Sequence, residues 1–251
     1  MSHQNQHKKH KNSSGHPHKK DEVIDEKQNL IDNYKEMKEK LLSSKIGLIN
    51  AGGSCYMASI IQILIHLEKF LDVFLNDKCK VGFSNKFFIF LQHLAKAKYD
   101  IEIKNLADEY NRINNKFNGE EGNNPMTFFT EFIKELSKEN KEILNLFKGE
   151  KEVHFDDIKN YIEQFLFYLV ILDKNNNNIT VLINQGRIYD DAKEGKHNPI
   201  LLERIRKSPE ILIINLEIEN IKYEGEEDIV VEKDNYKLVA VNRYSDYHSI
   251  A

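Results

Sequence analysis

Cys55 is the residue with the clearest chemical potential in this sequence, because it stands where a glycine-rich loop meets an apolar segment. Residues 45–54 contain three glycines, and residues 56–68 are apolar on nearly all sides, which predicts a buried helix. Backbone N–H groups and the positive end of a helix dipole favour thiolate over thiol. The position therefore predicts a nucleophile at neutral pH. The alternative is a small buried side chain with a packing role, which is common for cysteine outside disulfides.

A histidine is the natural proton acceptor for such a thiol, and the chain offers several. His66 and His93 lie on apolar faces of predicted helices, where packing or a solvated helix edge explains them. His154 and His197 have no sequence context that points to catalysis. His248 follows a predicted strand near the end of the chain, and its alternative role is that of an ordinary histidine on a surface strand.

The segments that precede Cys55 divide into a tail and a helix. Residues 1–20 contain five lysines, five of the ten histidines, no acid and no hydrophobic residue beyond Met1, so we expect a disordered basic tail. Residues 21–44 carry apolar side chains at helical spacing among charged ones, which predicts an amphipathic lead-in helix.

After Cys55 the pattern changes from helices to strands, which indicates an α+β protein whose two halves meet at a cleft. Helices are predicted for residues 56–68, 86–98, 103–117 and 125–147. A hairpin is predicted from residues 164–173 and 179–184, a short helix from 199–207, and strands from 210–218, 229–232 and 236–243.

Composition limits the class of protein. The chain has 251 residues, 40% of them hydrophobic and 30% charged, with a net charge of −4 and two cysteines, Cys55 and Cys79. Its longest apolar run, residues 165–172, is much shorter than the ~20 residues that span a bilayer. Secreted, membrane-spanning and collagen-like proteins are excluded, and the net charge gives no general attraction to nucleic acid. We expect an intracellular protein of the cytoplasm or nucleus, with Cys79 as an ordinary thiol.

A longer motif surrounds Cys55. Residues 47–64 read Gly-Leu-Ile-Asn-Ala-Gly-Gly-Ser-Cys-Tyr-Met-Ala-Ser-Ile-Ile-Gln-Ile-Leu. This stretch resembles the cysteine box of the ubiquitin-specific proteases, GL-x-N-x-G-x-x-CYMNS-x-x-Q-x-L, and departs from it only at Ala58, where the family has asparagine. Residues 208–216 and 236–242 are similar to two later strands of the family, and residues 247–251 take the place of its histidine box.

The resemblance implies a papain-like cysteine peptidase fold over residues 45–251, with an N-terminal helical half, a C-terminal antiparallel sheet and the active site between them. Cys55 would attack the carbonyl after the C-terminal glycine of ubiquitin or a ubiquitin-like protein. His248 would serve as general base and acid, and the side chain of Asn50 and the backbone N–H of Cys55 would stabilise the oxyanion. The implied function is a thiol-dependent deubiquitinase that cleaves isopeptide or peptide bonds. The alternative is an inactive ubiquitin-binding scaffold.

The chain departs from the family pattern after the cysteine box. The Asp or Asn that holds the family's histidine lies well downstream of it, whereas this chain stops three residues after His248. We therefore expect either a fragment without its closing strands or a Cys–His dyad. Tyr247 and Ser249 replace the usual glycine and tyrosine around the histidine, and Pro125 stands where the family has an acid that meets ubiquitin. The family's zinc-binding Cys-x-x-Cys pairs are missing from the sequence, so no metal or cofactor is expected.

Overall fold

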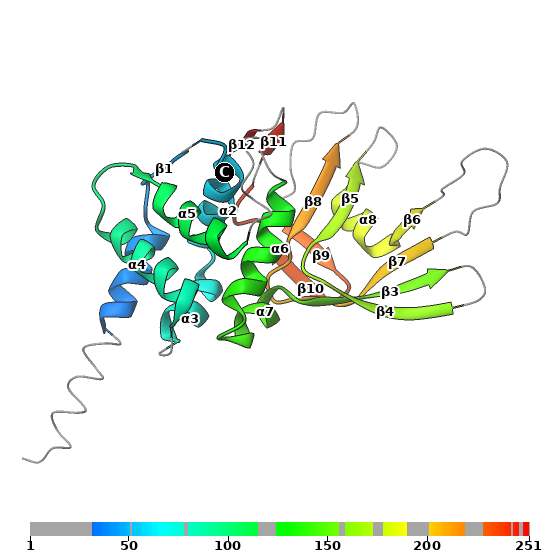
Figure 1. Cartoon of the computed structure of the whole chain (residues 1–251). Coiled ribbons are helices and arrows are strands. Elements are labelled where there is room, and N and C mark those ends of the chain that lie inside the picture. The colour runs from blue at the N-terminus through cyan, green and yellow to red at the C-terminus, as the bar shows by residue number, and fades with distance from the viewer. Residues whose placement is uncertain are drawn as a thin grey trace, which may run out of the picture.

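A computed structural model describes ten stretches of the chain, and the predicted tail 1–20, Cys79 and His197 lie outside them. The described residues are 32–50, 52–77, 80–114, 124–155, 159–172, 178–189, 201–218, 228–241, 243–245 and 248–250. The helices gather in the N-terminal half and the strands in the C-terminal half, and the two halves lie side by side (Figure 1). None of the described helices has the length and apolar composition needed to cross a membrane.

The N-terminal half is a cluster of helices around an aromatic core. A first helix covers residues 32–42 of the lead-in segment predicted over 21–44, and its Leu41 is fully buried. The helices that follow are α2 (Cys55–Leu64), α3 (Glu68–Asn76), α4 (Gly82–Lys96), α5 (Lys104–Ile113), α6 (Pro125–Leu136) and α7 (Lys141–Phe147). Phe87 and Phe132 meet edge to face with ring centroids 5.2 Å apart, and Phe128 packs beside Phe132 at 5.1 Å. Such contacts between large buried rings fix how the helices pack.

The C-terminal half is built on a four-stranded sheet with the order β4-β3-β7-β6, in which every neighbouring pair is antiparallel. Its strands are β3 (Gly149–Phe155), β4 (Lys159–Phe165), β6 (Arg187–Tyr189) and β7 (Leu201–Lys207). A separate parallel pair and a hairpin lie beside it, made of β5 (Tyr168–Leu172) with β8 (Ile214–Ile218) and of β9 (Asp228–Val231) with β10 (Asp234–Lys237). The expected α+β class is confirmed, and the expected antiparallel sheet is present with a parallel pair in addition.

One predicted helix ends earlier than expected, and another is divided in two. The helix predicted for 56–68 ends at Leu64, and α3 begins after a tight turn in which the N–H of Leu67 donates to the carbonyl of Leu64 at 3.2 Å. The helix predicted for 125–147 is broken before Asn140, whose side chain accepts a hydrogen bond from the N–H of Glu142 at 3.0 Å and so starts α7. The first break lies in a partly apolar stretch that gives no clear stop signal, whereas the second lies in the polar run 137–142, which contains the capping Asn140.

The predicted hairpin of 164–173 with 179–184 is wrong. Residues 179–185 form helix α8 (Ile179–Gln185), because the side chain of Asn178 accepts from the N–H of Val181 at 2.7 Å and starts a helix there. Ile179 and Ile183, four residues apart, are both buried on one side of α8. β5 pairs instead with the distant strand β8. The β-branched composition of 179–184 was outweighed by a helix cap and by tertiary packing.

The short helix predicted for 199–207 is also wrong, because β7 occupies residues 201–207 and pairs with β3 and β6. Its burial alternates, with Glu203 and Ile205 buried and Arg204 and Arg206 exposed, as expected of a strand. The sequence reading also missed β3 and β4, whose polar residues hid the strand pattern. Ion pairs stabilise this part of the sheet, since Lys151 Nζ lies 2.9 Å from Glu203 and 3.3 Å from Glu163.

The strand predicted for 236–243 is shorter than expected. β10 ends at Lys237, and residues 238–241 are exposed and pair with no strand in the part of the chain that the structure describes. The next strand is β11 (Arg243–Ser245), which pairs antiparallel with β12 (His248–Ile250).

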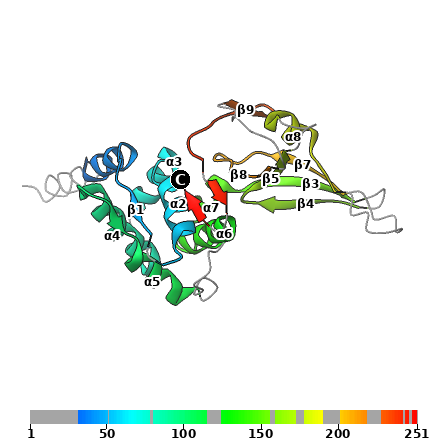
Figure 2. The ribbon, with the colours of Figure 1, turned by 90° about the horizontal axis from the view of Figure 1, so that it is seen from above.

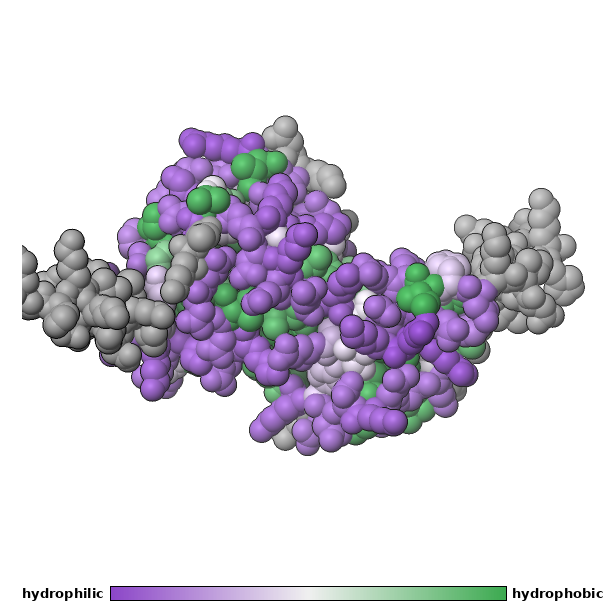
Figure 3. All heavy atoms as spheres, turned by 90° about the horizontal axis from the view of Figure 1, so that it is seen from below, coloured by the Kyte–Doolittle hydropathy of each residue, from purple (hydrophilic) through white to green (hydrophobic). Residues whose placement is uncertain are grey.

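The two halves have separate hydrophobic cores that meet along residues 211–214 and also at residues 165–166, where Phe165 lies in the core of the strand half and Leu166 packs against the core of the helical half. In residues 211–214 the side chains of Ile211 and Ile213 pack against the core of the helical half, and those of Leu212 and Ile214 pack against the core of the strand half. The N–H of Ile211 also donates to the carbonyl of Leu146 in α7 at 2.8 Å. Seen from below, the surface is mainly hydrophilic and its apolar atoms show as small separate groups (Figure 3).

Candidate active site

Cys55 is the first residue of α2 and its side chain is buried, with 9% exposure. The loop before it turns sharply, because Gly52 and Gly53 both have positive φ angles, of 53° and 71°. Glycine adopts this conformation without the steric cost that a Cβ brings. The sequence thus places a thiol at the N-terminal end of a helix, directly after a turn that two glycines allow.

Helix α2 is a rigid support for this thiol. Eight of its ten residues are buried, and it packs against α6, where the rings of Tyr56 and Phe128 meet edge to face at 5.3 Å. Gln62 joins the helix to the preceding segment, since its Nε2 donates to the carbonyl of Ile46 at 3.3 Å. This half-buried amide thus ties α2 to the segment that leads into the loop.

The strand before the loop is fixed as well. β1 (Leu48–Ile49) pairs in parallel with β2 (Ile101–Glu102), and the N–H of Gly47 donates to Oδ1 of Asp100 at 2.7 Å. Both ends of the loop are therefore held, by β1 on one side and by α2 on the other.

Asn50 lies in this loop, exposed to solvent, and its amide has a defined orientation. Its Oδ1 accepts hydrogen bonds from the backbone N–H and from the Oγ of Ser54, both at 2.9 Å. Because a backbone N–H can only donate, the atom that faces it must be the amide oxygen. Nδ2 is consequently turned away from Ser54, and it makes no hydrogen bond to any other described residue.

The backbone of His248 lies on β12, opposite Ser245 of β11 in the antiparallel register. β12 contacts α2, and both ribbon views place it beside the helix that begins at Cys55 (Figures 1 and 2). Segments almost two hundred residues apart in the sequence thus come together at this edge of the molecule. The structure brings Cys55 and Asn50 into one loop and the strand of His248 beside them, and the roles of all three residues stay predictions.

The other described histidines have other surroundings. His66 follows the far end of α2, where its Nδ1 lies 2.7 Å from the carbonyl oxygen of Gln62. His93 is exposed on α4. His154 lies on β3 in the strand half, with Nδ1 2.8 Å from Oδ1 of Asn160.

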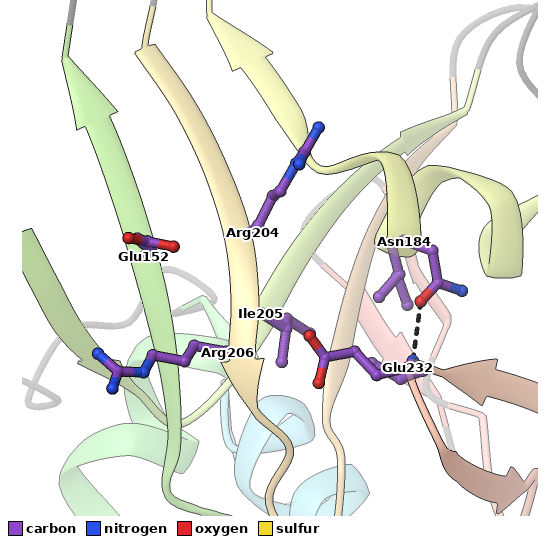
Figure 4. A pocket seen from close by; sticks show the side chains of 8 residues that line it. Glu152, Asn184, Arg204, Ile205, Arg206 and Glu232 are labelled. Atoms are coloured by element: carbon purple, nitrogen blue, oxygen red, sulfur yellow. Dashed lines mark hydrogen bonds between the residues drawn. The ribbon is translucent and has the colours of Figure 1, made fainter. Parts of the chain in front are cut away.

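A pocket lies in the strand half, and its described lining residues carry no group suited to nucleophilic catalysis. Its charged lining is mixed, with Arg204 and Arg206 on β7, Glu152 on β3 and Glu232 at the turn after β9 (Figure 4). Asn184 also lines it, and its Oδ1 accepts a hydrogen bond from the N–H of Glu232 at 2.8 Å. None of the described residues that line this pocket is a cysteine, serine or histidine. Within the described residues, no group of three or more His, Cys, Asp or Glu side chains is arranged to hold a metal ion.

Comparison with known proteins decides the family. The family model described as ubiquitin carboxyl-terminal hydrolase matches residues 46–246, which is most of the chain. The chain belongs to the ubiquitin carboxyl-terminal hydrolase family. The match to this family includes Asn50 and Cys55 and ends before His248.

Solved structures share the fold of this ubiquitin carboxyl-terminal hydrolase domain. A chain of the SAGA DUB module Ubp8/Sgf11/Sus1/Sgf73 bound to monoubiquitin is 18% identical, with a TM-score of 0.55 and coverage of 80% of this chain and 51% of that chain. A chain of the same module bound to ubiquitin aldehyde is 19% identical, with a TM-score of 0.53 and coverage of 77% and 50%. The chain therefore spans about half the length of the solved chains that it matches. No curated protein matches it significantly.

The likeness confirms the papain-like fold expected from the cysteine box of this hydrolase domain. Sequence reasoning did not single out Ser54, although its hydroxyl and N–H both contact Asn50. The motif leaves that position variable, and the direction in which a hydroxyl donates cannot be read from residue spacing.

Proposed function

We propose that this chain is a thiol-dependent deubiquitinase that hydrolyses the isopeptide or peptide bond after the C-terminal glycine of ubiquitin or a ubiquitin-like protein. One observation carries the proposal. Within a ubiquitin carboxyl-terminal hydrolase domain, the loop that ends at Cys55 holds the Asn50 amide with its oxygen engaged and its donor group turned outward. A thiol and an oriented amide donor on one loop suit the formation and stabilisation of an oxyanion.

In the proposed reaction, Cys55 Sγ attacks the carbonyl carbon of the terminal glycine while His248 accepts the thiol proton. The carbonyl oxygen becomes an oxyanion, to which Nδ2 of Asn50 donates a hydrogen bond. When the intermediate collapses, the C–N bond breaks and His248 gives its proton to the leaving amine. Water then attacks the resulting thioester with His248 as base, which releases the carboxylate and restores the thiol.

Ubiquitin as the partner is supported by the family and by the solved neighbours. The matched structures are described as DUB modules bound to monoubiquitin and to ubiquitin aldehyde. An aldehyde at the end of ubiquitin is an electrophile that a nucleophile of the module can attack, which suits a thiol mechanism.

The proposal is tested by incubating the chain with ubiquitin that carries a thiol-reactive electrophile at its C-terminus. We expect one covalent adduct, seen as a mass increase of one ubiquitin, that is lost in Cys55→Ala and kept in Cys79→Ala. The second variant is the matched control, since it removes the chain's other thiol. Circular dichroism verifies that each variant is folded.

Two results would contradict the proposal. An adduct that persists in Cys55→Ala would assign the nucleophile elsewhere. A folded wild-type chain that binds ubiquitin in calorimetry but forms no adduct and releases no product from a ubiquitin C-terminal amide would be the inactive binding module instead.

A further inference from the structure

Ser54 occupies the position that normally caps a helix, yet its side chain does not cap α2. It is the residue directly before the first turn, and its hydroxyl accepts no capping hydrogen bond from that turn. A serine at this position usually accepts from an N–H two or three residues later, which stabilises the helix. Here the hydroxyl points back along the chain and donates to Oδ1 of Asn50 at 2.9 Å. Ser54 therefore holds the side chain of Asn50 in the loop, while the first turn of α2 has no side-chain cap.

Ser54 contacts Asn50 through two hydrogen bonds. The backbone N–H and the hydroxyl of Ser54 both donate to the same amide oxygen, each at 2.9 Å. An amide oxygen has two lone pairs, so these two donors occupy both of them. Rotating the amide by half a turn would place its NH₂ group against the backbone N–H of Ser54, which can only donate, and this contact is repulsive. Only one orientation of the Asn50 amide satisfies this arrangement.

The two partners differ in burial, which tells which of them positions the other. Ser54 is 4% exposed and is covered by the core around α2, whereas Asn50 is exposed. An exposed asparagine samples several rotamers unless something fixes it, and fixing it costs conformational entropy. The buried serine is the immobile partner, and the asparagine is the one that is held.

We propose that Ser54 is a positioning residue that fixes the Asn50 amide with Nδ2 facing outward, ready to donate to the oxyanion. The inference rests on the proposed function, in which that amide stabilises the intermediate. A donor that is already oriented needs no reorganisation when the negative charge develops on the oxyanion. Its hydrogen bond therefore lowers the activation free energy by its full amount. Ser54 acts through Asn50 and does not touch the substrate.

The kinetic test is a double-mutant cycle on hydrolysis of a ubiquitin C-terminal fluorogenic amide. Ser54→Ala removes the hydroxyl donor, and we expect kcat to fall roughly 5- to 10-fold with KM unchanged, the size of one hydrogen bond. Ser54→Thr keeps a hydroxyl at that position and should restore kcat to within about twofold of the wild-type value. In an Asn50→Ala background, Ser54→Ala should change kcat by less than about twofold, because the amide that Ser54 positions has been removed.

A matched control lies in the same helix. Ser59 is also 4% exposed, and its Oγ donates to the carbonyl of Tyr56 at 3.1 Å. Ser59→Ala removes one buried hydroxyl without touching Asn50, and kcat should stay at the wild-type value. An equal loss of kcat from Ser54→Ala in both backgrounds, or a matching loss from Ser59→Ala, would overturn the proposal.

An NMR measurement separates this inference from the proposed function. In a sample labelled with ¹⁵N-asparagine, the side-chain NH₂ pair of Asn50 is assigned by its disappearance in Asn50→Ala. We expect high order parameters for this pair in the wild type and in Ser54→Thr, and a clear drop in Ser54→Ala. Unchanged order in Ser54→Ala refutes the positioning role. If the wild-type NH₂ pair is ordered but Asn50→Ala hydrolyses the amide substrate at the wild-type rate, the oxyanion role is refuted while the orientation of Asn50 by Ser54 is retained.

Discussion

At the scale of single residues, the amide of Asn50 is the group on which the proposed oxyanion role depends. Its oxygen accepts from Ser54 and its nitrogen faces away from Ser54, so under the proposed function the two ends of one side chain serve different partners. A substitution can therefore remove the NH₂ donor of this side chain and keep the acceptor for Ser54. The oxyanion role can then be tested while the hydrogen bonds within the loop are retained.

We predict that Asn50→Asp lowers kcat by about 10²- to 10³-fold, because a carboxylate keeps an acceptor for Ser54 but cannot donate to an oxyanion and adds a repelling charge. Binding should change little, since the loop keeps its internal hydrogen bonds. Steady-state hydrolysis of the ubiquitin amide measures kcat and KM, and thermal unfolding verifies that stability is retained. A rate for Asn50→Asp within threefold of the wild type would remove Asn50 from the mechanism.

The parts of the site that lie close together in the sequence were predictable, and the parts that depend on distant segments or on side-chain orientation were not. Asn50 and Cys55 belong to one short motif, so the sequence could place them on the same loop. The approach of β12 to α2 joins segments that are distant in the chain, and only the resemblance to a family indicated it. The side-chain contact of Ser54 depends on which way a hydroxyl points, and no pattern of residue types contains that information.

At the scale of elements, helices with a single apolar stripe were predictable and polar strands were not. α4, α5 and α6 each present apolar residues at helical spacing and appear near their predicted positions. β3 carries charged residues along its length, and its stability comes from partners on β4 and β7 that the local sequence does not reveal. α8 is rich in β-branched residues, and its helical state is decided by the Asn178 cap and by the core beneath it.

The end of α8 depends on a glycine. Gly186 has a φ of 81°, and its N–H donates to the carbonyl of Leu182 at 3.1 Å to close the helix. A Cβ at this position would lie 2.5 Å from the backbone carbonyl oxygen of Glu203 on β7, well inside van der Waals contact. The turn from α8 into β6 can therefore approach the sheet only without a side chain.

We predict that Gly186→Ala lowers the free energy of unfolding by about 3 kcal/mol, since backbone strain and a clash with main-chain atoms add together. Gly82→Ala is the matched control. Its φ is also positive, at 48°, but its Cβ would meet only the flexible carboxylate of Glu139 at 3.3 Å, so we expect a loss of about 1 kcal/mol. Urea denaturation followed by circular dichroism measures both, and equal losses would show that the sheet yields to the added methyl group.

At the scale of the whole molecule, the chain has two hydrophobic cores and a candidate site that draws on both halves. Cys55 belongs to the helical half, while β12 follows the strand half in the sequence and lies against α2. The halves meet at residues 165–166 and along the segment 211–214, where alternate side chains enter opposite cores. Because the cores are otherwise separate, we expect each half to open without the other.

We therefore predict that a cavity in one core loosens that half selectively. Leu172 on β5 and Leu91 on α4 form a matched pair, since both are fully buried and they belong to different cores. Leu172→Ala and Leu91→Ala should each cost about 2–5 kcal/mol locally. In hydrogen exchange read by mass spectrometry, Leu172→Ala should speed exchange in β5, β8 and α8 while α4 and α6 keep their protection, and Leu91→Ala should do the reverse. Faster exchange in both halves from either variant would mean that the shared residues 165–166 and 211–214 couple the two cores into one cooperative unit, and the site would then open only with the whole fold.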